Sequence, residues 1–164
     1  MWDQTQMRTI EGTTPARPSR FAVVVSKYHD FVTDRLQAGA LAALVAADVP
    51  TDQVTIVRVP GAFEVPIAAR RAAETGQFDA IICLGCLIRG ATPHFEYIAS
   101  AVAHGLTTAS GDTGVPMTFG VLTTNSVEEA IERAGEGRSN KGWEAAAAAI
   151  EMAAIIKQLA EGQQ

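Results

Sequence analysis

The sequence predicts an α/β protein in which a four-stranded parallel sheet is covered by helices on both faces, giving three layers. Two observations predict this class. From residue 20 onward, short apolar runs alternate with longer segments of helical periodicity. The short runs are continuously apolar rather than alternating, as expected for parallel strands that are buried on both faces.

The first half of the domain shows this order clearly. Residues 21–25 (FAVVV) are an apolar run of strand length, and residues 30–49 place apolar side chains along one helical face. Residues 55–63 are expected to form a strand that stops at a Pro-Gly pair. Residues 64–76 are expected to form a helix, and the glycine at its end is a natural C-cap.

The second half repeats the pattern. Residues 80–85 (AIICLG) are expected to form a strand and residues 94–106 a helix. A proline opens the last strand, residues 117–124, and two helices at 126–135 and 140–160 close the domain. Because crossovers between parallel strands are right-handed, this order predicts a flavodoxin-like three-layer sandwich.

The chain divides into an arm, one domain and a tail. Its 164 residues are 48% hydrophobic and 19% charged, a globular composition sufficient for one core. Residues 1–19 are polar and form the N-terminal arm, residues 20–160 the domain, and residues 161–164 the tail. Within the arm, residues 7–11 could pair as a short edge strand, with a neighbouring subunit as the candidate partner.

Composition also narrows the function classes. The net charge of −5 and the isoelectric point of about 5.1 argue against nucleic acid as a partner, which needs a basic face. No apolar run reaches the length of a membrane span, and residues 1–20 lack the apolar region of a signal peptide. We therefore expect no membrane association and a cytoplasmic location.

The two cysteines, Cys83 and Cys86, form a C-x-x-C motif. Redox motifs of this spacing lie at a helix start, whereas Cys83 falls inside a predicted strand. Two cysteines are also too few for a structural zinc site. We expect both thiols to pack in the core, with the redox function as the alternative, and we expect no metal.

In open parallel sheets, ligands bind beyond the carboxyl ends of the strands. There the segment 85–95 reads GCLIRGATPHF. Thr92 is a good N-cap and Pro93 suits the first helical position, so the amides around Ala91 and Thr92 would form an anion site. His94 follows in the first turn, where the helix dipole disfavours a protonated imidazole, so this histidine suits proton acceptance. The alternative is that His94 merely occupies a helix start.

Other predicted loops carry further candidates. Tyr28 and Phe63 offer aromatic surfaces, and Glu64 offers a carboxylate beside them. Arg133 and Lys141 could bind an anion. Considered alone, Glu64 could equally be a helix-start glutamate, and the two cations could be solvated surface residues.

Four segments, in this order and spacing, resemble lumazine synthase: VPGAFEVP, GCLIRGATPHFEYIA, TFGVLTTNSVEEAIERAG and NKGWEAA. The resemblance runs from Phe21 to Leu159. It implies an enzyme of riboflavin biosynthesis that works at the penultimate step and needs no cofactor. The implied reaction condenses 5-amino-6-(D-ribitylamino)uracil with 3,4-dihydroxy-2-butanone 4-phosphate. The products are 6,7-dimethyl-8-ribityllumazine, phosphate and water.

The resemblance also implies roles for individual residues toward the pyrimidine substrate. Tyr28 matches the aromatic residue that stacks on the pyrimidine. Ala62 and Glu64 match the positions that hold the ribityl chain, with Phe63 between them. Leu87 and Ile88 match the lining of the heterocycle pocket.

Toward the phosphate substrate, Ala91 and Thr92 match the phosphate cradle and His94 matches the proton-transfer residue. Phe119 matches a residue that the neighbouring subunit contributes. Arg133 matches the phosphate partner from that neighbour, with the lysine of the SNKG turn close by.

A site completed by a neighbour implies a cyclic homo-oligomer, a pentamer in this family. Some members assemble pentamers into a 60-subunit icosahedral shell. The short turn at 135–140 and the arm segment RTIEG favour the shell here, while Pro15 and Pro18 could disturb pairing of the arm. Riboflavin synthase is a further candidate partner.

One departure from the family concerns His29, which stands where the family usually has asparagine. It adds a titratable group near the pocket. Tyr28 in place of phenylalanine or tryptophan is a milder change. Two other functions compete: a lumazine- or flavin-binding protein without activity, and a flavodoxin-like regulatory domain. The first would not need a phosphate site, and the second would need clustered acidic residues at the strand ends.

Overall fold

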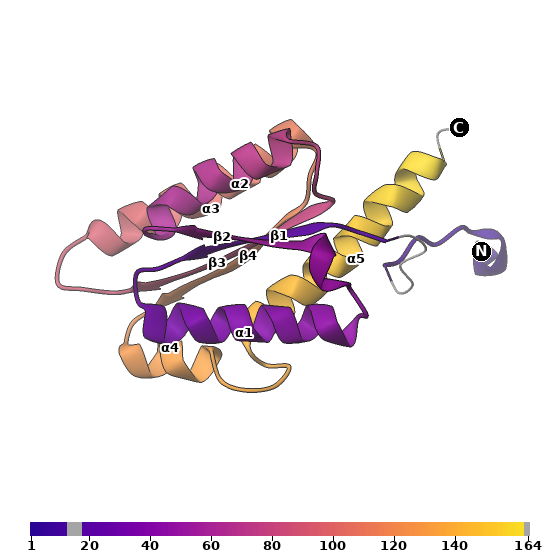
Figure 1. The fold of residues 1–164 in the computed structure, drawn as a ribbon. Helices are drawn as coiled ribbons and strands as arrows, with labels where there is room; N and C mark the ends of the chain where they lie inside the picture. The colour runs from indigo at the N-terminus through magenta and orange to yellow at the C-terminus, as the bar shows by residue number, and fades with distance from the viewer. Residues whose placement is uncertain (13–17, 163–164) are drawn as a thin grey trace.

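The computed structural model describes residues 1–12 and 18–162, and it contains one sheet between two layers of helices (Figure 1). The strands all run parallel, in the order β2-β1-β3-β4. They are β1 (Phe21–Ser26), β2 (Val54–Val59), β3 (Ala80–Ile88) and β4 (Met117–Thr124).

Five α-helices and three short 3-10 turns complete the described chain. The helices are α1 (Asp30–Ala46), α2 (Val65–Glu74), α3 (His94–Thr113), α4 (Val127–Arg133) and α5 (Lys141–Glu161). The turns are η1 (Gln4–Gln6), η2 (Thr51–Gln53) and η3 (Ala62–Glu64). One apolar cluster joins the sheet to α1, α4 and α5, and a second joins it to α2 and α3 (Figure 1). The predicted three-layer α/β fold is confirmed.

The central strands are buried on both faces, as their continuous apolar sequences predict. In β1, alternate residues belong to the two clusters, with Val23 on the side of α1 and Val24 on the side of α2. The edge strand β2 differs, because Thr55, Ile56 and Arg58 are exposed. An edge strand has a sheet neighbour on one side only, so helices cover it less completely.

Several predicted element ends were wrong. Strand β2 ends at Val59 rather than at residue 63, because the chain turns into η3 there, and α1 ends at Ala46 rather than at residue 49. Strand β3 continues past residue 85 to Ile88, because it pairs with β4 as far as Thr124. Helix α3 continues past residue 106 to Thr113 and ends at Gly114, whose φ of 73° is left-handed. Gly105 does not end the helix; it lets α3 lie close to Pro66, since an added Cβ would come within 3.0 Å of that ring.

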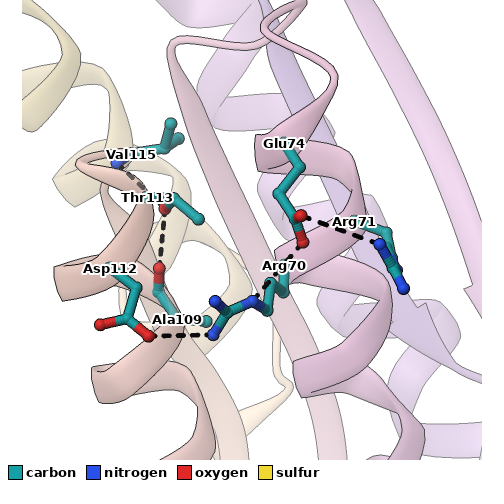
Figure 2. Close-up of polar contacts among 7 residues, drawn as sticks. All are labelled: Arg70, Arg71, Glu74, Ala109, Asp112, Thr113 and Val115. Carbon is teal, nitrogen blue, oxygen red and sulfur yellow. Dashed lines mark hydrogen bonds and ion pairs between the residues drawn. The ribbon is translucent and has the colours of Figure 1, made fainter.

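An ion pair joins α2 to the C-terminal end of α3, and two further pairs lie beside it within α2 (Figure 2). Arg70 binds Asp112 of α3 at 3.1 Å and Glu74 of its own helix at 3.5 Å. Arg71 lies 3.8 Å from Glu74. These exposed pairs contribute little stability individually.

The opposite layer depends on a close contact between α1 and α5. Asn140 is the buried N-cap of α5, and its Oδ1 accepts hydrogen bonds from the backbone of Gly142 and Trp143 at 2.7 and 3.1 Å. Its Nδ2 donates to the carbonyls of Gly135 and Arg35. The start of α5 is thereby tied to α1 and to the preceding turn.

The N-terminal arm lies beside the C-terminal half of α5 (Figure 1). Gln158 donates to the carbonyl of Glu11 at 2.7 Å, and Lys157 donates to Pro18 and Ser19. Residues 7–11 form no strand in this chain, so pairing of the arm with a neighbour stays a prediction. Pro15 and the last two residues of the predicted tail lie outside the described residues. Within residues 1–12 and 18–162, no helix combines the length and hydropathy needed to cross a membrane.

Candidate functional site

The predicted site residues around His94 line a cavity of about 530 Å³. A second cavity of similar volume, about 560 Å³, lies against α1 and α5 and contains none of these residues. The first cavity lies at the carboxyl edge of the sheet, where ligands bind in open parallel folds. Its walls come from the segments that follow β1, β2 and β3, from the end of β3 itself, and from the first residues of α3 and α4. The lining residues are Tyr28, His29, Gly61, Ala62, Phe63, Glu64, Cys86, Leu87, Ile88, Gly90, Thr92, His94, Phe95, Ile98 and Val127.

Backbone hydrogen bonds hold the first two of these segments together. Lys27 donates to the carbonyl of Val59 at 2.8 Å, and Tyr28 donates to that of Pro60 at 3.0 Å. The parallel pairing of β1 and β2 therefore continues beyond the strands. The ring of Tyr28 is left 68% exposed at the cavity, where it is available to a planar ligand.

His29 has an unusual backbone conformation, with φ 61° and ψ 49° in the left-handed region. Histidine and asparagine both tolerate this region better than most residues. The imidazole packs edge-on against Tyr28, with ring centroids 4.5 Å apart, and against Phe31 at 5.8 Å. Partial burial lowers the pKa of His29, because desolvation disfavours the charged imidazolium.

The segment after β2 places Glu64 and Phe63 at the cavity. Phe63 is 64% exposed, whereas the preceding residue, Ala62, is buried. The Glu64 carboxylate lies beside Gly61, where an added Cβ would be 3.3 Å from Oε2. An aromatic surface and a carboxylate thus border the cavity together, as the sequence predicts.

The segment after β3 brings Thr92 and His94 to the cavity, and both are exposed. The N-cap of α3 is Pro93, not Thr92 as predicted, and it makes no side-chain capping bond. Helix α3 nevertheless begins at His94, the first residue of the predicted range, and the amide of Tyr97 donates to the carbonyl of Pro93. Ala91 lies between two lining residues without lining the cavity itself.

The other predicted residues lie in a different place. Phe119, Arg133 and Lys141 line a separate cavity of about 320 Å³, and it shares no lining residue with the first. Arg133 donates to the carbonyl of Glu129 at 3.3 Å, and Lys141 forms an ion pair with Glu144 at 2.9 Å. Within one chain, the structure therefore divides the predicted residues into two groups.

The cysteines are buried and unpaired on opposite faces of β3. Burial raises the pKa of Cys83 to about 12 and that of Cys86 to about 11, because a thiolate is poorly solvated there. Neither thiol is a ready nucleophile, although Cys86 is among the residues that line the cavity. Among the residues that the structure describes, no group of three or more potential ligands could hold a metal ion.

Several lining residues were absent from the sequence-based set of site residues. Ile98 follows His94 by one helical turn, so helical spacing could have indicated it. Phe95 adjoins His94, and Val127 opens the helix after β4, at the predicted ligand edge. Cys86 gave no such signal, because a cysteine in an apolar strand is typical of a core.

The sequence profile of the 6,7-dimethyl-8-ribityllumazine synthase family matches residues 18–157. A protein of that name from Chloroherpeton thalassium is 50% identical over 93% of this chain and 99% of its own length. Another from Syntrophus aciditrophicus is 50% identical over 91% of this chain and 97% of its own length. A third, from Desulfatibacillum aliphaticivorans, is 46% identical over 92% of this chain and 97% of its own length. The chain is therefore an enzyme, and it belongs to the 6,7-dimethyl-8-ribityllumazine synthase family.

Proposed function

We propose that this enzyme forms 6,7-dimethyl-8-ribityllumazine in a site that two subunits complete. One subunit supplies the cavity around His94, and its neighbour supplies Phe119, Arg133 and Lys141. The observation that carries this proposal is the division of the site residues between two separate cavities of one chain.

The reaction condenses 5-amino-6-(D-ribitylamino)uracil with 3,4-dihydroxy-2-butanone 4-phosphate and releases phosphate and water. It is the penultimate step of riboflavin biosynthesis. An amine adds to a ketone, phosphate leaves and the ring closes. Such a sequence requires two aligned reactants and the transfer of protons.

The first cavity suits the pyrimidine substrate. The exposed ring of Tyr28 stacks on the heterocycle, and Leu87 and Ile88 form an apolar wall. The Glu64 carboxylate accepts hydrogen bonds from the ribityl hydroxyls. These contacts hold the amine toward His94, which transfers protons as the new bonds form.

The phosphate substrate is held between the two subunits. The backbone around Ala91 and Thr92, before α3, approaches the phosphate from one side. Arg133 of the neighbour approaches from the other side with a charge-assisted contact. Arg133 is exposed and donates a hydrogen bond to the Glu129 carbonyl, a neutral group that does not compensate its positive charge.

The molecule has an apolar surface suited to such an assembly. A groove of about 580 Å³ between α3 and α5 includes Phe119, Met152 and Ile156, which are 49%, 37% and 39% exposed. Covering this groove with a second copy would bury these side chains. We propose the pentamer as the assembly. The 60-subunit shell, riboflavin synthase as a partner and the cytoplasmic location stay predictions.

The test follows lumazine absorbance and phosphate release with both substrates. For the wild type we expect product well above the spontaneous background. His94→Ala should lower kcat by roughly 10²-fold or more, because a positioned base is lost. Arg133→Ala should raise the KM of the phosphate substrate by about 10-fold or more, because a charge-assisted contact is lost.

Arg138→Ala is the matched control for Arg133, since this arginine lies over Trp143 and lines neither cavity of the proposed site. It should leave both constants unchanged. Tight lumazine binding without product would instead indicate a binding protein.

A mixing experiment tests the shared site directly. Subunits of His94→Ala and Arg133→Ala are unfolded together, refolded as hybrids and assayed. If neighbours complete each site, roughly a quarter of the sites in a random hybrid ring contain both native residues, and activity returns. If both residues acted within one subunit, no hybrid would regain activity.

A further inference from the structure

We infer that Arg89 is a positioning residue that holds the cavity loop, residues 90–95, in its working shape. This inference rests on the proposed function, because it concerns the loop that carries His94. Arg89 does not line the cavity. It would therefore act through the residues that do.

One side of Arg89 is fixed to the segment after β4. Its backbone amide donates to the carbonyl of Thr124 at 2.8 Å, which extends the pairing of β3 with β4. Its side-chain Nε donates to Oδ1 of Asn125 at 2.8 Å. The amide of Asn125 in turn donates to the Glu129 carboxylate of α4 at 2.9 Å.

The other side of Arg89 reaches the first turn of α3. Its guanidinium forms an ion pair and hydrogen bond with the Glu96 carboxylate. The guanidinium carbon also lies 4.6 Å from the centre of the Phe95 ring, in a cation–π arrangement. The hydrogen bond from Arg89 lowers the pKa of Glu96, so the pair stays charged at neutral pH.

These contacts fix both ends of the loop, because the side chain of Arg89, at one end, binds Phe95 and Glu96 at the other. The loop starts at Gly90, next to Arg89, and ends at Phe95 and Glu96, which Arg89 binds. Gly90, Thr92 and His94 lie between the fixed points and line the cavity. The first turn of α3 has no side-chain cap, so the Arg89 contacts supply a restraint that a cap would otherwise give.

The chemistry of the contacts requires arginine. Its planar group can bind Asn125 and Glu96 through different nitrogens while stacking on Phe95. A lysine could retain one ion pair, but it could not bind two partners through separate nitrogens of one planar group or stack on the ring. The guanidinium is already paired with a carboxylate, which distinguishes it from an arginine that awaits a phosphate.

The experiment compares Arg89→Met and Arg89→Lys with the matched control Arg70→Met. Arg70 is also a half-exposed arginine that binds α3, but it binds at the opposite end, through Asp112 (Figure 2). We expect kcat to fall by roughly 10- to 100-fold in Arg89→Met, because small misplacements of reacting groups are costly. In Arg89→Lys the fall in kcat should be smaller. Arg70→Met should stay within about twofold of wild type, because its contacts lie far from the site.

A second set of variants separates positioning from direct phosphate binding. Glu96→Gln and Asn125→Ala each remove one contact of Arg89 while keeping the arginine, and neither residue lines the cavity. If Arg89 acts as a positioning residue, both should lower kcat, and combining either with Arg89→Met should add little further loss. If Arg89 binds the phosphate itself, Glu96→Gln frees it, and the KM of the phosphate substrate should fall while kcat is retained. That result would overturn the inference.

Hydrogen exchange gives a readout that is independent of activity. The amides of Gly90, Ala91, Thr92 and His94 should exchange faster in Arg89→Met than in the wild type, and no faster in Arg70→Met. Unchanged exchange, or equal kcat in the two methionine variants, would overturn the inference. A wild type that makes no product would contradict the proposed function instead, and the exchange experiment would still decide the role of Arg89.

Discussion

The backbone at His29 places a limit on which side chains can occupy that position. His29 is the N-cap of α1, and its left-handed backbone turns the chain from β1 into this helix. Its imidazole makes no capping hydrogen bond. Most residues with a Cβ are strained there, and asparagine, aspartate and histidine are the common exceptions. The exchange of asparagine for histidine therefore preserves the turn, while it adds a titratable ring that contacts Tyr28.

This ring predicts a pH dependence of stability. Burial lowers the pKa of His29 in the folded state, so below pH about 6.5 the unfolded chain binds the proton more readily. The wild type should therefore lose stability, relative to His29→Asn, as the pH falls from 8 toward 5. Thermal unfolding of both proteins across this range measures the difference. A gap in Tm that is constant with pH would contradict the assignment.

At the residue scale, much of the site was predictable because its signals are local. Tyr28, Glu64 and His94 follow strands whose carboxyl ends meet at one edge, so their proximity follows from topology. The N-cap of α3 was not predictable in this way. Thr92 and Pro93 both suit a helix start, and the choice between them depends on how β3 delivers the chain into the loop.

At the scale of elements, α1 and α5 approach each other closely at two glycines, Gly39 and Gly142. A Cβ added to Gly142 would lie 1.9 Å from the carbonyl oxygen of Leu36. One added to Gly39 would lie 2.2 Å from Oδ1 of Asn140. Asn140 can therefore bind backbone of both neighbouring segments only while these two positions stay small.

Gly142→Ala should lower the free energy of unfolding. Alanine favours the helical backbone over glycine by at most about 1 kcal/mol, and by less here in the first turn, whereas the overpacking against Leu36 costs on the order of 1–3 kcal/mol and forces the helices apart. We expect a net loss, measured by urea unfolding at fixed protein concentration. Gly39→Ala should act in the same direction. A Gly142→Ala protein as stable as the wild type would show that the helices separate without cost.

The order of the elements was predictable, and their ends less so. Apolar runs located β1 and β4 closely, since a buried strand needs continuous apolar sequence. The end of α3 was misjudged because residues 107–113 (TTASGDT) are mostly polar and poor helix formers, so the sequence gives little sign that the helix continues. The exposure of β2 also required the sheet order, which places that strand at an edge.

At the scale of the whole molecule, an apolar groove adjoins one of the two incomplete cavities. The groove between α3 and α5 shares Phe119 with the cavity that holds Arg133 and Lys141. A neighbour that covers the groove would therefore approach these residues. Assembly and catalysis should fail together when this surface changes.

Ile156→Glu tests that connection. Its side chain is 39% exposed in one chain, so a charge there should cost the isolated subunit little. Within a closed interface the same charge would be buried without a partner, and the oligomer should dissociate with loss of activity. Sedimentation velocity and the lumazine assay measure the two effects.

Val45→Glu is the control, because it adds the same charge at a 68% exposed position on α1, outside this groove. It should leave assembly and rate unchanged. An Ile156→Glu protein that stays assembled and active would show that the subunit interface does not include this groove.

The left-handed turn at His29 has a consequence for how this position can change over generations. The codons of histidine differ from those of asparagine and aspartate only in the first base. The residues that this backbone accepts are therefore neighbours in the genetic code. A lineage can exchange the neutral amide for the imidazole in one mutational step, without passing through a chain that folds poorly.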